Sequence, residues 1–141
     1  HKMEYFTRHD SMAQAVDAFI NLATATDGTS PGAIKIPQHV RRIIGIISTV
    51  SIYGAVTIDI GATFTIKLRG KALPQGDQDI CLGGISSNEV GTSVGSTFDA
   101  SPADYLPVDI QLVRGEDLFI DGAHHGTDLG TPFLSVTLVM I

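Results

Sequence analysis

The sequence lacks the features on which disulfide-rich folds and membrane proteins depend. Its 141 residues include one cysteine, Cys81, which excludes an internal disulfide framework and a cysteine-based zinc site. Charged residues make up 17% of the chain, below the roughly 25% that is typical of soluble domains, and tryptophan is absent. The longest uninterrupted apolar run, residues 43–47, is far shorter than the roughly 20 residues of a spanning helix. We therefore expect no membrane span.

Positive charge is also scarce, because nine Lys and Arg face fifteen Asp and Glu for a net charge of -6. The one basic pair, Arg41-Arg42, has no basic run around it, so we expect no nucleic-acid partner. Residues 1–71 have a balance of +3 and residues 72–141 one of -9. This asymmetry is compatible with complementary faces between subunits, although a solvated acidic surface explains it more simply.

The N-terminal region carries the one helical pattern. Ser11 and Gln14 fit a capping box, and the spacing predicts an amphipathic helix over residues 10–25. Glycine and proline follow in residues 27–32, so we expect residues 1–32 to form a helical arm with a linker. The helix either covers its own domain or docks on a neighbour. Its apolar face comprises Met12, Val16, Phe19, Ile20 and Ala23.

From residue 33 to residue 141 the hydrophobic period changes from 3.6 to 2. In residues 56–69, apolar side chains alternate with Thr, Asp, Lys and Arg, which predicts one long strand. The shorter patterns predict strands at residues 33–36, 43–53, 79–82, 108–112, 118–120 and 134–140. Residues 83–107 are rich in Gly and Ser and predict a long loop. Seven or eight strands of this kind indicate a sandwich or barrel, with Cys81 buried in a strand.

Two motifs are candidates for a catalytic site or a metal site. Gly91-Thr92-Ser93-Val94-Gly95 matches a nucleophile elbow, but neither the strand before Ser93 nor the helix after it is indicated. Two carboxylates and two imidazoles gather in residues 121–128. Adjacent histidines on an extended strand point to opposite faces, and the spacing matches no familiar zinc motif. We therefore expect a polar loop, no cofactor and no enzymatic activity. Any cation or pH-dependent contact would involve Asp121, His124, His125 or Asp128.

Residues 33–141 resemble the single jelly-roll capsid proteins of tailless icosahedral viruses of bacteria and archaea. The resemblance rests on the order of three segments: Ala33-Ile-Lys-Ile-Pro37, the long alternating strand with its Gly/Ser loop, and Pro107 to Gly122 followed by Gly130 to Ile141. It implies an all-β jelly-roll sandwich of eight antiparallel strands in two sheets. It also implies no enzymatic activity and assembly into rings or a lattice, in a major, minor or decoration role.

Several apolar residues are not explained by a single core, which independently favours subunit contacts. We expect a homo-oligomer, possible contacts with other virion proteins, and a location in the virion after synthesis in the host cytoplasm. Otherwise we expect a cytoplasmic protein, because no secretory signal or glycosylation sequon is visible. The alternative is a jelly-roll module that binds a carbohydrate or a cell-surface receptor through residues 83–107 and 121–130. The expected interface residues are Met12, Val16, Phe19, Ile20, Ile43, Ile47, Val139 and Ile141.

Overall fold

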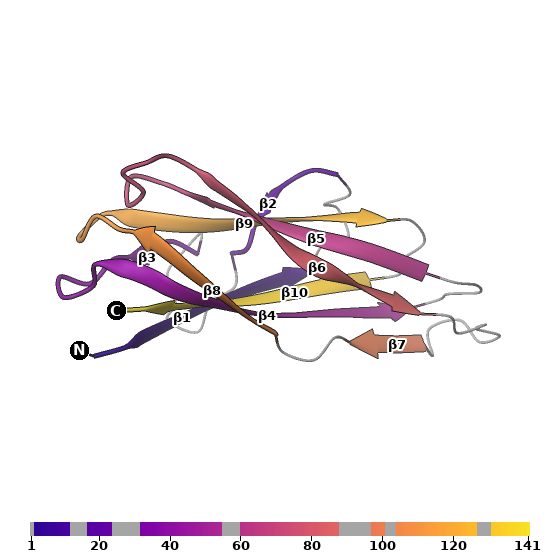
Figure 1. Ribbon diagram of the computed structural model, residues 1–141. Helices are drawn as coiled ribbons and strands as arrows, with labels where there is room; N and C mark the ends of the chain where they lie inside the picture. The colour runs from indigo at the N-terminus through magenta and orange to yellow at the C-terminus, as the bar shows by residue number, and fades with distance from the viewer. Residues whose placement is uncertain are drawn as a thin grey trace.

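The computed structural model shows two antiparallel β-sheets stacked as a sandwich (Figure 1). It describes residues 2–11, 17–23, 32–54, 60–87, 97–100, 104–126 and 131–141. The lower layer in the figure, which we call sheet A, contains β1 (Glu4–Ser11), β10 (Thr131–Met140), β4 (Arg42–Gly54), β7 (Thr97–Ala100) and β8 (Asp104–Gln111). The upper layer, sheet B, contains β2 (Ile20–Asn21), β3 (Ile34–Lys35), β9 (Asp117–Gly126), β5 (Ile60–Arg69) and β6 (Gln78–Ser87).

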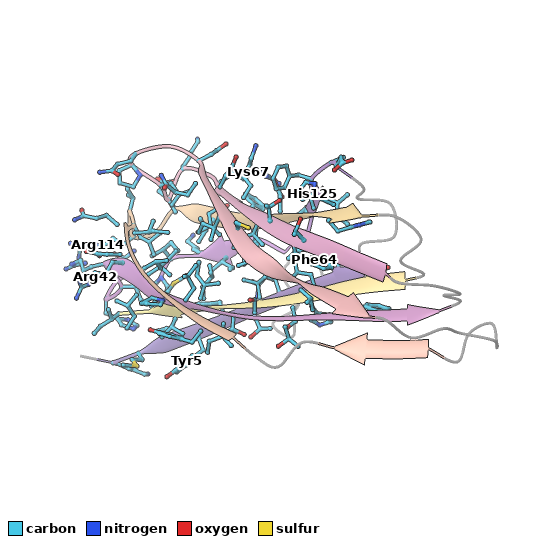
Figure 2. All side chains as sticks on the ribbon, turned by 45° about the vertical axis from the view of Figure 1, so that its right-hand side comes forward. Tyr5, Arg42, Phe64, Lys67, Arg114 and His125 are labelled. Carbon is cyan, nitrogen blue, oxygen red and sulfur yellow. The ribbon has the colours of Figure 1, made fainter. Side chains whose placement is uncertain are left out.

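Alternation along the strands separates a core face from an outer face in each sheet. In β10, Leu134, Val136 and Leu138 are buried, whereas Phe133 is exposed. In β5, Phe64, Ile66 and Leu68 are buried. These side chains meet between the layers, and Phe64 lies between the two sheets in Figure 2. The all-β sandwich expected from the sequence is therefore present.

Sheet A pairs the first strand with the last strand. β1 lies antiparallel to β10 from Glu4–Met140 to Ser11–Phe133, and β10 pairs with β4 on its other side. β8 and β7 pair with successive parts of β4. In sheet B, β9 lies between β5 and the short strands β2 and β3, and β6 forms the opposite edge.

The N-terminal region differs from the expected helical arm. Asp10 and Ser11 belong to β1, and Ile20–Asn21 pairs with β9. The described residues contain no helix, and thus none that could span a membrane. Residues 12–16 and 24–31, which include Met12 and Val16, lie outside the described residues. The boundary expected at residues 32–33 therefore does not separate an arm from the sandwich, because β1 and β2 are strands of its two sheets.

The expected loops at residues 83–107 and 121–130 are also largely strand where the structure describes them. β6 continues to Ser87, β8 begins at Asp104, and β9 continues through the histidines to Gly126. Glycine and polar residues tolerate strand geometry when a neighbouring strand pairs with them, as β5 does with both β6 and β9, so composition alone misplaced these boundaries. Residues 88–96, 101–103 and 127–130, which include the elbow-like segment and Asp128, lie outside the described part.

A buried arginine ties β1 to the chain that enters β3. The Arg8 side chain is 2% exposed. Its Nε donates to Gly32 O at 2.7 Å, its Nη2 to Ala33 O at 3.0 Å, and its Nη1 to Thr7 O at 2.9 Å. A buried cation is tolerated only when its donors are satisfied, and here backbone carbonyls accept from them. This side of the sandwich is therefore closed by a cross-link between the layers.

Candidate self-assembly surface

The outer face of sheet A includes aligned rows of side chains without Asp, Glu, Lys or Arg, and the exposed Arg42–Asp109 ion pair lies beyond these rows on β4 and β8. Strand register places residues from β1, β10, β4 and β8 next to one another on this face. The rows read Tyr5–Val139–Gly45–Pro107, Thr7–Thr137–Ile47–Tyr105, His9–Ser135–Thr49 and Ser11–Phe133. Histidine is the one residue among them that could carry charge near neutral pH. We call these residues the sheet A face.

Large aromatic side chains project from the sheet A face. Tyr5 is 59% exposed, Tyr105 52% and Phe133 43%. Figure 2 shows Tyr5 pointing away from the core on the side opposite Lys67 and His125. Single exposed apolar residues are normal, but these three share one face with Val139 and Ile47. Aromatic enrichment with depletion of charge is the composition found at the centre of protein interfaces.

Glycine shapes this face at one position. The Tyr105 ring lies over Gly45, at the place that a β-carbon would occupy, and its hydroxyl donates to Ile44 O at 3.3 Å. The glycine thus allows the ring to lie along β4. The same neighbourhood explains why Val139, which lies between Tyr5 and Gly45 in the row, is only 4% exposed.

The other end of the sheet A face is hollowed. The hollow has a volume of about 310 Å³ and is lined by His9, Asp10, Thr49, Phe133, Leu134 and Ser135. Between the tyrosines and this hollow, the Thr7 and Thr137 hydroxyls hydrogen bond to each other at 2.7 Å. This pair uses part of their hydrogen-bonding capacity within the chain, which lowers the cost of covering the face with another protein surface.

The outer face of sheet B has the opposite character, because its charges are paired. Arg69 Nε lies 2.6 Å from Asp121 Oδ2, and its guanidinium lies 4.5 Å from the centre of the Phe119 ring. Lys67 Nζ lies 4.0 Å from Asp79 Oδ1. Asp121 is buried under its pair with Arg69, whereas Arg69, Lys67 and Asp79 keep much of their side chains in water at little cost.

Residues 17–19 dock on sheet B of their own chain. Asp17 Oδ1 lies 2.6 Å from His125 Nδ1, and His125 Nε2 lies 3.2 Å from Thr65 Oγ1. Phe19 packs over Lys67, with 4.8 Å between the ammonium and the ring centre. The order of hydroxyl, imidazole and carboxylate is that of a nucleophilic triad. Here, however, the Asp17 and His125 side chains are 73% and 39% exposed on an open sheet face. The contact therefore holds residues 17–19 against sheet B, and we call it the Asp17–His125 clamp.

The three candidate metal ligands that the structure describes, Asp121, His124 and His125, do not converge. His124 is buried beside Phe64 in the core, whereas Asp121 and His125 lie on the outer face of β9. Asp121 is paired with Arg69, and four residues of strand, about 13 Å, separate it from His125. Among the described residues, no three His, Cys, Asp or Glu side chains are close enough to hold a metal ion.

The expected interface residues divide between the core and both outer faces. Ile43 is fully buried in the core, because an irregularity in β4 between Ile43 and Gly45 shifts the alternation. Ile47 and Val139 lie on the sheet A face, and Ile141 continues β10 beside Arg42. Phe19 lies on the outer face of sheet B against Lys67, and Ile20, on β2 of that sheet, packs against the core.

Sequence reasoning missed the aromatic residues of the sheet A face. Tyr5 lay in a segment assigned to the arm, and Tyr105 in a segment assigned to a loop. The signal that could have found Tyr5 is a period of two in β1, where Phe6, Arg8 and Asp10 face the core and the residues between them face outward. This signal is weak, because only one of the three core-facing residues is apolar. Cys81, expected in the core, is exposed on β6.

Comparisons with known proteins assign no family. No family model matches the chain, and no curated protein matches it. Among solved structures, it is similar to one described as the structure of Eiger TNF from S. frugiperda. The two share 8% identity with a TM-score of 0.38, over 96% of this chain and 90% of the other.

Proposed function

We propose that this chain is a non-enzymatic structural protein that assembles with copies of itself through the sheet A face, as a component of a virion. The observation that carries the proposal is the contrast between the two outer faces. The rows of the sheet A face hold Tyr, Phe, Val, Ile and Pro beside Thr, Ser and His, and the exposed Arg42–Asp109 pair lies beyond them on β4 and β8. The outer face of sheet B carries paired charges at Lys67, Arg69 and Asp121.

The physical argument concerns the cost of exposing apolar surface. The thirteen positions of the sheet A face each cover about 33 Å², from a strand spacing of about 4.8 Å and a row spacing of about 6.8 Å, so the face covers about 420 Å². Part of this area is Thr, Ser and His, and the exposed apolar side chains within it include Tyr5, Tyr105 and Phe133. Exposed apolar side chains that gather on one face of a soluble protein mark interaction sites. Because Tyr and Phe have few rotatable bonds, ordering them at an interface costs little conformational entropy.

The virion setting and the jelly-roll assignment rest on the resemblance of residues 33–141. The strand order supports the jelly roll, because β1 pairs with β10 and the chain passes repeatedly between the sheets. The alternative of a carbohydrate-binding module placed its ligand on loops at residues 83–107 and 121–130. Residues 121–126 are strand and His124 is buried, so no observation of the described residues favours this alternative.

The proposal is tested by placing one charge on each outer face and measuring mass by light scattering at micromolar concentration. Tyr5→Glu puts a carboxylate on an exposed position of the sheet A face, where burial by a second copy would leave it unpaired. Thr63→Glu, at an exposed position on the outer face of sheet B, is the matched control.

We expect an oligomer for the wild-type chain and for Thr63→Glu, and a monomer or much weaker oligomer for Tyr5→Glu with an unchanged circular dichroism spectrum. A wild-type chain that is monomeric at micromolar concentration would rule out the proposal. So would an assembly that Tyr5→Glu leaves intact.

A further inference from the structure

Two arginines from distant parts of the chain converge on one carbonyl at an end of the sandwich. Arg41 Nη1 donates to Gln38 O at 3.2 Å, and Arg114 Nη1 donates to the same oxygen at 3.4 Å. The sum of these two distances is the most that can separate the two Nη1 atoms. Figure 2 shows Arg42 and Arg114 at this end of the molecule, away from Lys67. We call Arg41 and Arg114 the arginine pair.

Backbone hydrogen bonds fix the segments that carry the arginine pair. The turn that contains Arg114 is bonded to Ile36, because Gly115 N donates to Ile36 O at 2.8 Å and Ile36 N donates to Glu116 O at 3.0 Å. The backbone N–H and carbonyl of Arg41 each form a bond of 2.8 Å, to the residues that directly follow β10 and β8. Since both side chains start from fixed positions, a ligand would lose less entropy in ordering them.

The arginine pair keeps most of its donors available. A guanidinium has five N–H donors, and within the described residues each of these two contacts only Gln38 O. Both contacts are longer than the about 2.9–3.0 Å that is typical of N–H···O bonds. The nearby carboxylates are engaged elsewhere, since Asp109 pairs with Arg42 at 3.5 Å and Glu4 with His39 at 3.0 Å. Two like charges are therefore held close together, although the chain as a whole has a net charge of -6.

We propose that the arginine pair binds one phosphate or sulfate group. A tetrahedral oxyanion offers several oxygens to two planar guanidiniums, and hydrogen bonds between ionised partners are stronger than neutral ones. The negative charge also relieves the repulsion between the two arginines. A nucleic acid would need a longer row of free cations, whereas the adjacent Arg42 is already paired with Asp109. The site lies beyond the rows of the sheet A face and does not depend on the proposed function.

The test is a titration with sodium phosphate at constant ionic strength, followed by phosphorus NMR, because the phosphate signal broadens when the anion binds to a protein. Arg41→Gln and Arg114→Gln each remove one guanidinium from an exposed position and keep a polar side chain. Lys67→Gln removes one positive charge from the outer face of sheet B and is the matched control. Circular dichroism confirms that each variant is folded.

We expect saturable broadening that sulfate reverses and that chloride at equal ionic strength does not. Binding should be about tenfold weaker in Arg41→Gln and in Arg114→Gln, and unchanged in Lys67→Gln. Equal reversal by chloride, or equal binding by the wild-type chain and both arginine variants, would overturn the proposal.

Glucose 6-phosphate, titrated in the same way, separates the two sources of the group. Binding at least as tight as that of inorganic phosphate would support a ligand that carries the group as an ester on a larger molecule. Weaker binding, lost in the same two variants, would support the free anion as the ligand. Either result requires the arginine pair.

Discussion

The buried arginine of β1 gives the sharpest test of the folded subunit. Arg8→Met keeps a long unbranched side chain but removes every donor of the guanidinium. Three backbone carbonyls, those of Thr7, Gly32 and Ala33, would lose a charged partner. A buried acceptor left without its hydrogen bond costs about 1–3 kcal/mol. The apolar replacement recovers part of this loss, because a buried charge no longer has to be removed from water.

We therefore expect Arg8→Met to lower the free energy of unfolding by about 3 kcal/mol, with one kilocalorie from each carbonyl. For a chain of this length, that loss corresponds to a fall in Tm of about 6–12 °C. The assay is urea unfolding followed by circular dichroism, with thermal unfolding as a check. Arg42→Met is the matched control, because Arg42 is half-exposed and paired at 3.5 Å, so its loss costs less than about 1 kcal/mol.

The result that would refute this reasoning is an Arg8→Met variant as stable as Arg42→Met. It would mean that residues 32–33 do not depend on the arginine. Hydrogen exchange gives a second reading, because the loss of the cross-link should speed exchange of amides in β1 and β3 more than in β5 and β6.

Three further predictions follow from individual contacts. Gly45→Ala displaces the Tyr105 ring from β4. We expect the free energy of unfolding to fall by about 1 kcal/mol and assembly, measured by light scattering, to weaken clearly. Unchanged assembly would contradict the role given to Tyr105. Gly70→Ala places a side chain at φ +127° against Asp117 O, so the free energy of unfolding measured in denaturant should fall by about 1–3 kcal/mol. Gly76→Ala is the control, because the space around Gly76 is open and the free energy of unfolding should fall less. His125→Gln weakens the contact with Asp17. Hydrogen exchange of the amides of residues 17–23 should become faster, while exchange in β5 should stay the same. Equal exchange rates in the wild-type and variant proteins would show that the contact does not hold this segment.

The strands that the sequence could predict are those whose core face is continuously apolar. The strand predicted at residues 56–69 is confirmed as β5 from Ile60 to Arg69, whereas residues 56–59 lie outside the described residues. The C-terminal alternation is confirmed as β10. These patterns are local, so a short window contains the information needed. The C-terminal strand also carries Val139 outward, which follows from the same alternation.

β1 could not be predicted in the same way, because its core-face positions include Arg8 and Asp10. Their partners lie at residues 23, 32 and 33, so no local pattern reveals why a charged side chain is tolerated there. The helical spacing of Met12, Val16, Phe19 and Ile20 then gave a competing local signal. Where the structure describes this stretch, strand pairing of Ile20 with Gly122 prevails.

The prediction that Ile43 lies at an interface was wrong for a related reason. Its place in an apolar run allowed either face, and the irregularity at residues 43–45 turns it inward against Ile110 and Met140. Bulges of this kind depend on the register of both neighbouring strands, which a single sequence does not supply. The sheet A face therefore emerges from pairing across four strands, and from no contiguous motif.

The central claim is that another copy covers the sheet A face, and side-chain footprinting tests it most directly. Hydroxyl-radical labelling of Tyr5, Tyr105 and Phe133 is measured as the protein concentration rises from nanomolar to micromolar, with Phe119 on sheet B as the internal reference. We predict that labelling of the three sheet A residues falls severalfold while labelling of Phe119 stays constant. Equal labelling of Tyr5, Tyr105 and Phe133 at every concentration would contradict the account.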